Sequence, residues 1–165
     1  KSKGEIMKLM LYNPAKHEHF LKDYLLSDIS HTDSPQNIID KYRLDHNRYP
    51  VAILNNEENK IIGFFCFHLG SGPQEYGFYQ NDYALIRGFS IDDRYRNQGY
   101  GSKALKDIFQ FIDLTLNLKT NHIILAVNEK NLQAQKAYKN SGFSIIKRNV
   151  KGKKGNLLIM EKVRI

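Results

Sequence analysis

The sequence is poor in cysteine and in long apolar runs. Its 165 residues contain one cysteine, Cys66, so no disulfide can form within the chain. A single thiol fits a reducing compartment, and we expect a cytoplasmic protein. Cys66 lies in the apolar stretch GFFCFHL with no base beside it, which predicts a buried core residue and not a nucleophile. No run of about 18 apolar residues is present, so we expect no membrane-spanning helix.

Other features are also missing. The start, KSKGEIMKLM, is charged and lacks the apolar core of a secretory signal. Residues 1–6 precede Met7, and we expect them to be disordered and leave them out of the fold prediction. There is no internal repeat, low-complexity tract or linker, and the length suits one domain. We therefore expect residues 1–165 to form a single domain, as a monomer or a homodimer.

Positive charge is concentrated near the C-terminal end. The formal net charge is +8, and residues 147–164 hold seven Lys and Arg residues against one acid, which is six of the eight excess charges. A charged turn most often forms a solvated face. The alternative is a non-catalytic module that binds nucleic acid through this basic hairpin. The hairpin lacks the interleaved aromatics of single-strand binders, so we do not expect a nucleic-acid partner.

The apolar pattern predicts seven strands and four helices in an α/β arrangement with a mixed sheet. The expected strands are 7–12, 51–54, 60–69, 83–91, 122–127, 143–150 and 156–163, with a polar turn after Leu54. The expected helices are 16–26, one that starts at Ser34-Pro35, one from about 100 to 118, and 131–141. Residues 70–82 form a loop rich in Gly, Pro and aromatics, a composition and length typical of functional loops.

The stretch RNQGYGSKA, residues 96–104, has three possible interpretations. A P-loop is excluded, because Ser102 separates Gly101 from Lys103 where Gly must precede Lys directly. The dinucleotide fingerprint GxGxxA matches literally and would indicate an NAD(P)-binding oxidoreductase. That fingerprint should follow its strand at once, whereas residues 90–97 intervene here. The third interpretation explains more of the chain.

The backbone of residues 97–102 lies at a predicted helix start. Four amide donors there have no intrahelical partner, and the helix dipole adds partial positive charge. The two glycines let this backbone approach an anion such as a diphosphate. Three cations surround it: Arg94, Arg96 and Lys103. An ordinary helix-initiating turn needs neither the glycines nor this charge, so we predict an anion-binding cradle.

Two motifs in this region resemble those of the GNAT superfamily of N-acetyltransferases. The run FSIDDRYRNQGYGSKALKDI resembles the acetyl-CoA signature, with Arg96, Gly99 and Gly101 at the matching positions. The run VNEKNLQAQKAYKNSGF resembles the second signature, with matches at Val127, Asn131, Ala134, Tyr138, Gly142 and Phe143. Both occur in the family's order and spacing, and the resemblance is close from Tyr83 to Phe143.

The resemblance implies a twisted, mostly antiparallel sheet of six or seven strands with about four helices. The strand 83–91 would splay from the strand that begins near His122 and admit acetyl-CoA. The implied activity is direct acetyl transfer from acetyl-CoA to a primary amine of a small molecule or peptide, without an acyl-enzyme. No metal is expected, since His17 and His19 do not share a helix face and no other cluster has ligand spacing.

The resemblance also implies the binding residues. The pantetheine arm would pair with the backbone of the strand's end, and the cradle would hold the diphosphate. The implied cofactor-binding residues are Phe89, Ser90, Ile91, Arg94, Arg96, Asn97, Gln98, Gly99, Tyr100, Gly101, Ser102, Lys103, Asn131, Ala134 and Tyr138. Asn131 and Tyr138 are seven apart, so they share a helix face about 10 Å apart along the axis. Tyr138 would be the general acid for the departing thiolate. Alternatively, Asn131 is a helix N-cap and Tyr138 a core tyrosine.

The general base departs from the family pattern. Many relatives carry a glutamate on the strand before the cradle, whereas YALIRGFSI has no acid and Arg87 is its only charge. Asp82 and Glu75 are the candidate bases, with His68 nearby; each is equally compatible with a solvated loop acid or a core-edge histidine. We expect the amine to bind between residues 16–46 and the loop 70–82. The acids there would suit a cationic amine: Asp28, Asp33, Asp45, Glu75 and Asp82.

Overall fold

The computed structural model describes residues 7–55, 60–116 and 119–165. Among them, one sheet of seven strands has the order β1-β2-β3-β4-β5-β7-β6. The strands are β1 (Met7–Leu11), β2 (Arg48–Asn55), β3 (Lys60–His68), β4 (Tyr83–Ile91), β5 (His122–Asn128), β6 (Ser144–Gly152) and β7 (Gly155–Val163). β4 pairs with β5 in parallel, and the other neighbouring strands pair antiparallel. The expected mixed, mostly antiparallel sheet is confirmed. The expectations for residues 1–6 and for most of the turn after Leu54 concern residues outside the described ranges.

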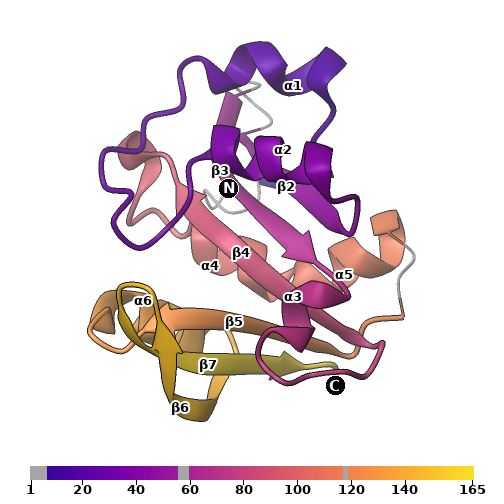
Figure 1. The fold of residues 1–165 in the computed structure, drawn as a ribbon. Coiled ribbons are helices and arrows are strands. Elements are labelled where there is room, and N and C mark those ends of the chain that lie inside the picture. The colour runs from indigo at the N-terminus through magenta and orange to yellow at the C-terminus, as the bar shows by residue number, and fades with distance from the viewer. Residues whose placement is uncertain (1–6, 56–59, 117–118) are drawn as a thin grey trace.

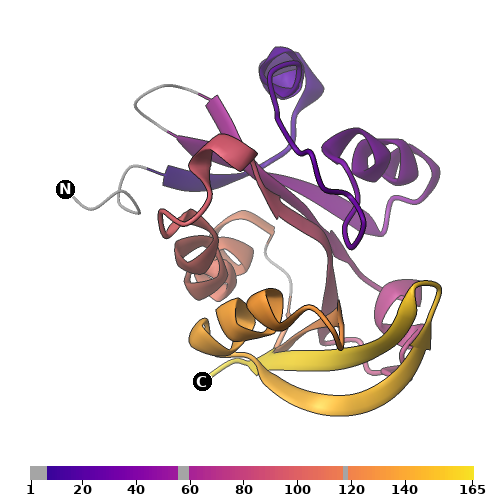
Figure 2. The ribbon, with the colours of Figure 1, turned by 90° about the vertical axis from the view of Figure 1, so that its left-hand side faces the viewer.

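Helices cover both faces of the sheet (Figures 1 and 2). They are α1 (Pro14–Leu21), α2 (Pro35–Leu44), α3 (Ser71–Gln74), the 3-10 helix η2 (Asp93–Tyr95), α4 (Tyr100–Lys106), α5 (Ile108–Phe111), the π-helix η3 (Ile112–Leu116) and α6 (Leu132–Asn140). Figure 2 shows α1 and α2 on one side of the sheet, with α4 and α6 on the other. In the described part of the chain, no helix is long and apolar enough to cross a membrane.

The first two helices begin in the same way. The Asn13 side chain accepts the Ala15 N–H at 3.0 Å, and the Ser34 side chain accepts the Asn37 N–H at 3.2 Å. A proline follows each cap, where its missing N–H costs nothing. This pattern correctly predicts the start of α2, but the prediction that α1 runs from residue 16 to 26 is wrong at both ends.

The early end of α1 has a tertiary cause. Beyond Leu21, the Tyr24 hydroxyl lies 2.7 Å from the Ser90 hydroxyl, and the Leu25 N–H donates to Asp92 at 2.9 Å. These bonds attach Tyr24 and Leu25 to the end of β4. The two residues, whose apolar spacing indicated a helix, therefore lie in a loop.

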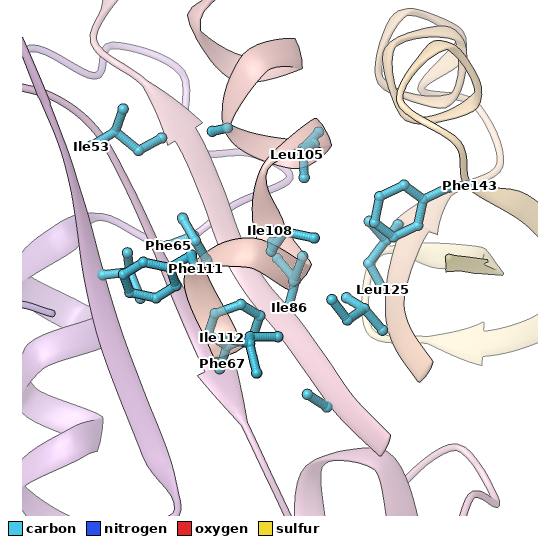
Figure 3. Close-up of a cluster of buried hydrophobic side chains, with 14 of the residues drawn as sticks. Ile53, Phe65, Phe67, Ile86, Leu105, Ile108, Phe111, Ile112, Leu125 and Phe143 are labelled. Atoms are coloured by element: carbon cyan, nitrogen blue, oxygen red, sulfur yellow. The ribbon is translucent and has the colours of Figure 1, made fainter. Parts of the chain in front are cut away.

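The helix expected over residues 100–118 is interrupted. α4 ends at Lys106, α5 starts at Ile108, and the last turn is a π-helix; residues 117–118 lie outside the described ranges. The apolar face nevertheless stays buried. Figure 3 shows Ile108, Phe111 and Ile112 packed toward the sheet beside Phe67. Cys66 faces the opposite side of β3, in a cluster beneath α2, and burial raises the pKa of its thiol to about 11. The expectation of a buried core cysteine is confirmed.

β4 and β5 pair along only part of their length. Their parallel pairing joins Tyr83–Ile86 to His122–Leu125 and stops there. Just beyond, β4 bulges against β3: Cys66 pairs with Arg87, yet Phe64 pairs with Ser90. The bulged segment of β4 contains Gly88 at φ +64°, a conformation that glycine adopts without a Cβ clash. The end of β4 therefore turns away from β5 (Figure 1), and the expected splay is confirmed.

Candidate active site

A cleft of about 440 Å³ lies where β4 and β5 separate. Its walls come from the α1–α2 loop, the ends of β4 and β5, the segment that leads into α4, and one face of α6. Of the fifteen residues predicted to bind the cofactor, the cleft brings together Phe89, Ser90, Ile91, Arg96, Asn97, Gly99, Tyr100, Gly101, Ser102, Asn131, Ala134 and Tyr138. One concave surface thus joins both sequence motifs.

Three of the predicted residues do not line the cleft: Arg94, Gln98 and Lys103. The Arg94 guanidinium lies against the buried carboxylate of Asp92, with Nη2 2.8 Å from Oδ2. The Lys103 ammonium pairs with Asp107 at 2.9 Å. The Gln98 amide donates to the Arg94 carbonyl at 3.2 Å. Two of the three cations expected around the cradle are therefore neutralised by carboxylates of the chain itself, and Arg96 is the one that faces the cleft.

The backbone that enters α4 has the shape of an anion cradle. Asn97 and Gly99 both have left-handed φ angles, +60° and +87°. The Lys103 N–H donates to the Gly99 carbonyl at 3.0 Å, so the amides before Lys103 have no acceptor within the helix. Successive N–H groups of a turn with such conformations can form a concavity that binds an anion. A Cβ built on Gly99 would meet no atom within 4 Å, so the space beside this backbone is open. These features fit a phosphate-bearing ligand.

Asn131 and Tyr138 stand on the cleft face of α6. Asn131 caps the helix, since its Oδ1 accepts the Ala134 N–H at 3.2 Å, and it also lines the cleft. The two interpretations of Asn131 are therefore compatible. The Tyr138 ring packs against Phe143 with centroids 5.9 Å apart. Burial raises the pKa of Tyr138 to about 12, so its phenol stays protonated at neutral pH and can donate a proton.

The two candidate bases lie away from the cleft. Asp82 precedes β4, where its carboxylate accepts from the Asn121 amide at 3.2 Å. Phe89 is seven residues further along the strand, roughly 23 Å at the usual rise. Glu75 accepts from the Arg87 guanidinium at 2.8 Å. Burial opposes ionisation of Glu75, but the hydrogen bond and charge of Arg87 outweigh it and hold the pKa below its usual range, which weakens Glu75 as a base.

His68 belongs to the same buried network. Its Nδ1 accepts from Arg87 Nε at 2.9 Å, so Nε2 carries the proton toward Asp45, 3.0 Å away. Burial lowers the pKa of His68, with the charges of Arg48 and Arg87 adding to the effect. The imidazole is thus neutral and fully bonded, as a core-edge histidine would be.

The expected acidic surroundings of the acceptor are largely neutralised. Asp33 pairs with Lys41 at 2.8 Å, and Asp45 faces His68 and Arg48. Of the five acids expected there, only Asp28 lines the cleft. Within the described residues, no group of His, Cys, Asp and Glu side chains is arranged to hold a metal ion.

The α1–α2 loop supplies cleft residues that neither motif contains. Asp28 is one of the acids expected near the acceptor, and Leu26, Ser30, His31 and Thr32 line the cleft with it. The Thr32 hydroxyl lies 3.5 Å from the Phe89 carbonyl, which joins the loop to the end of β4. No periodic pattern marks these residues. The only signal was a polar, turn-forming stretch between two helices, SDISHTDS.

Comparison with known proteins agrees with this geometry. A model of the acetyltransferase (GNAT) family matches residues 15–143. The chain belongs to this family. This GNAT chain is 30% identical over 155 residues to an uncharacterized N-acetyltransferase of Bacillus subtilis, YbbJ, covering 92% of this chain and 94% of that protein. It is 27% identical over 117 residues to the spermine/spermidine N(1)-acetyltransferase of the same organism, covering 71% and 73%.

A solved structure shows the same GNAT fold. A GNAT family acetyltransferase from Elizabethkingia anophelis with acetyl-CoA bound superposes with a TM-score of 0.68 at 14% identity, covering 97% of this chain and 99% of that chain. The oxidoreductase interpretation is wrong, because the described sheet contains one parallel pair and not the doubly wound parallel sheet of dinucleotide-binding folds. The protein is a GNAT acetyltransferase whose acetyl donor is acetyl-CoA.

Proposed function

We propose that this acetyltransferase transfers the acetyl group directly to a primary amine of a small molecule or peptide in the cleft between β4 and β5. The observation that carries the proposal is the continuity of one surface. The backbone around Gly99 forms one end, the end of β4 beyond its pairing with β5 forms the middle, and the α1–α2 loop forms the far wall. A donor with a diphosphate at one end and a thioester at the other has that shape.

The chain holds the donor through its backbone in this proposal. The amides between Asn97 and Ser102 bind the diphosphate, with Arg96 beside them. Phe89, Ser90 and Ile91 have no partner strand on the β5 side, so their backbone is available to an extended ligand arm, as in strand addition. One N–H there would polarise the thioester carbonyl. Arg94 and Lys103 are left out of the proposed binding set, since each is paired with an acid.

Tyr138 supplies the proton for the departing thiol in this proposal. Its phenol lines the cleft and its raised pKa keeps the proton in place at neutral pH. A thiol with an ordinary pKa near 8.5 is a fair leaving group, so the acid contributes moderately.

The acceptor is proposed to be an amine with little additional positive charge. Among the described residues that line the cleft there is one carboxylate, Asp28, and one guanidinium, Arg96. A polyamine such as spermidine, on which the second B. subtilis relative acts by its name, would meet little compensating charge. Two of the hairpin lysines contact the chain itself, since the Lys147 and Lys154 ammonium groups donate to the carbonyls of Tyr76 and Ser30, which leaves less of this charge for a nucleic acid.

Calorimetry and an acceptor panel test the proposal. The protein should bind acetyl-CoA, and thiol release should depend on an added amine drawn from spermidine, an aminoglycoside, a small monoamine and a peptide with a free N-terminus. Absence of measurable acetyl-CoA binding would overturn the proposal for this cleft. A cytoplasmic location is proposed with it, because the one cysteine of the chain is a free, buried thiol.

A further inference from the structure

The proposed reaction needs a group that takes a proton from the incoming ammonium. β4 carries no acid, and Glu75 and Asp82 lie outside the cleft. His31, in the α1–α2 loop, lines the cleft with its side chain exposed. We propose that His31 is the general base of this acetyltransferase. The inference rests on the proposed function, and it adds a catalytic residue that neither sequence motif contains.

The two neighbours of His31 define where it lies. The Ser30 carbonyl accepts from Lys154 Nζ at 2.7 Å, which ties the loop to the β6–β7 turn. The Thr32 hydroxyl lies 3.5 Å from the Phe89 carbonyl at the end of β4. His31 is therefore held between the turn and the strand whose backbone is proposed to bind the thioester. An amine entering between these elements passes the imidazole as it reaches the acetyl group.

The loop that carries His31 is anchored at its start as well. The Leu25 N–H donates to Asp92 and the Ser27 N–H to Asp93, both at 2.9 Å. Within the loop, Asp28 accepts from both the N–H and the hydroxyl of Ser30. These bonds hold a segment without helix or strand in a fixed position, which a base must have to meet its substrate.

The charges around His31 come from three elements. Asp28 stands in the same loop; hydrogen bonds from Ser30 hold the pKa of its carboxyl below the usual range, and the charges of His31 and Arg96 add to this. Arg96, from the segment before α4, also lines the cleft, and Lys154, from the β6–β7 turn, donates to the carbonyl of the neighbouring Ser30. Tyr95 and Tyr138 also line the cleft, and burial raises the pKa of the Tyr138 phenol.

The proton balance of the step is complete. His31 takes one proton from the ammonium, and the freed lone pair attacks the thioester carbonyl. The C–N bond forms and the C–S bond breaks as Tyr138 gives its proton to the departing thiolate. The second proton from nitrogen then restores the Tyr138 phenol, so the products are an amide and a thiol. The exposed imidazole of His31 releases its proton to water.

A histidine substitution tests the inference by its pH dependence. His31→Gln should lower kcat roughly 100-fold at pH 7, within the range for general-base catalysis, with an unchanged Kd for acetyl-CoA. The wild-type rate should fall as the pH is lowered, because a protonated base cannot accept the substrate's proton, and the variant should lose that pH dependence. The matched control is His46→Gln, since His46 is exposed and stacks on Tyr42 away from the cleft. Unchanged turnover and pH profile in His31→Gln would overturn the inference.

A second measurement needs no turnover. In protein labelled with ¹³C-histidine, the His31 signal, assigned by its loss in His31→Gln, should shift when acetyl-CoA is added, while the His46 signal stays in place. A stationary His31 signal in protein that calorimetry shows to be saturated with acetyl-CoA rejects the base and leaves the acetyltransferase assignment standing. Failure to bind acetyl-CoA at all rejects the proposed function instead.

Discussion

The Arg94 guanidinium encloses the buried carboxylate of Asp92, with Nε 3.0 Å from Oδ1 and Nη2 2.8 Å from Oδ2. Asp92 also accepts the N–H groups of Arg94 and Leu25, so it joins the α1–α2 loop to the end of β4. The charge pattern of the sequence places Arg94 at the phosphate. In the fold, Arg94 pairs with Asp92 instead, and Asp92 attaches the α1–α2 loop to the end of β4.

Removal of the Asp92 charge should destabilise the fold. Burial opposes its ionisation, but hydrogen bonds from Arg94 and Leu25 outweigh this and hold its pKa below the usual value. Since the folded pKa is depressed, the stabilisation is complete above the unfolded pKa near 4 and is lost as pH falls through the folded pKa. Asp92→Asn should cost about 3 kcal/mol at pH 7. Urea unfolding between pH 7 and pH 2 measures the loss of stability and its pH dependence. The control is Asp23→Asn, at an exposed position.

The unfolding measurements below pH 4 distinguish a contribution of the Asp92 charge from a contribution of its packing. The difference in unfolding free energy between wild type and Asp92→Asn should shrink as the pH falls below 4, because the wild type then protonates the same carboxyl. A difference that stays constant over this range would show that Asp92 contributes by packing and not by charge.

Substitution of Gly99 should separate the cradle from an ordinary helix start. Gly99→Ala places a Cβ in open space at φ +87°, which should cost roughly 1–2 kcal/mol of stability and obstruct the diphosphate. We expect the Kd for acetyl-CoA to rise at least tenfold. The control is Gly70→Ala, a glycine outside the cleft that also has a positive φ, +58°, and whose Cβ would make an ordinary contact 3.4 Å from the Asn47 side chain, so its Kd should not change. Calorimetry at a temperature where both variants are folded measures the difference. Equal affinities would contradict the cradle.

Sequence reasoning succeeded where the pattern is local or recurs in a motif. The seven strands follow from apolar runs, and the two motifs indicate residues that line one cleft, around Gly99 and on α6. It failed where distant segments meet. Tyr24 fits a helical spacing, yet its hydroxyl bonds Ser90, 66 residues away. The sequence pattern indicates no ion-pair partner for Glu75 or Arg94. In the fold, Glu75 pairs with Arg87 and Arg94 pairs with Asp92. No sequence pattern marks His31 as a site residue. Its position depends on a loop in which Ser30 accepts a hydrogen bond from Lys154, 124 residues away.

The Lys154 contact should matter for the acceptor more than for stability. Its ammonium, in the β6–β7 turn, donates to the Ser30 carbonyl of the α1–α2 loop. Lys154→Met keeps the length of the side chain but removes the donor, so the loop should lose one anchor and the KM for the amine should rise several-fold. The melting temperature should change by less than about 2 °C, as for exposed surface substitutions. Lys153→Met, at the exposed neighbouring position, is the control. A large drop in melting temperature in Lys154→Met alone would indicate a structural role instead.

Tyr138→Phe should separate binding from chemistry. The substitution removes the phenol hydroxyl and keeps the ring that packs on Phe143, so the fold and the Kd for acetyl-CoA should remain nearly unchanged. The departing thiolate then takes its proton from water, and kcat should fall roughly tenfold to 100-fold, toward the lower end of general-acid effects. Because the raised pKa of Tyr138 lies near 12, the wild type should show no loss of this acid up to about pH 10. Tyr79→Phe, at an exposed tyrosine outside the cleft, should behave as wild type. A Tyr138→Phe enzyme with full turnover would assign the phenol to packing alone.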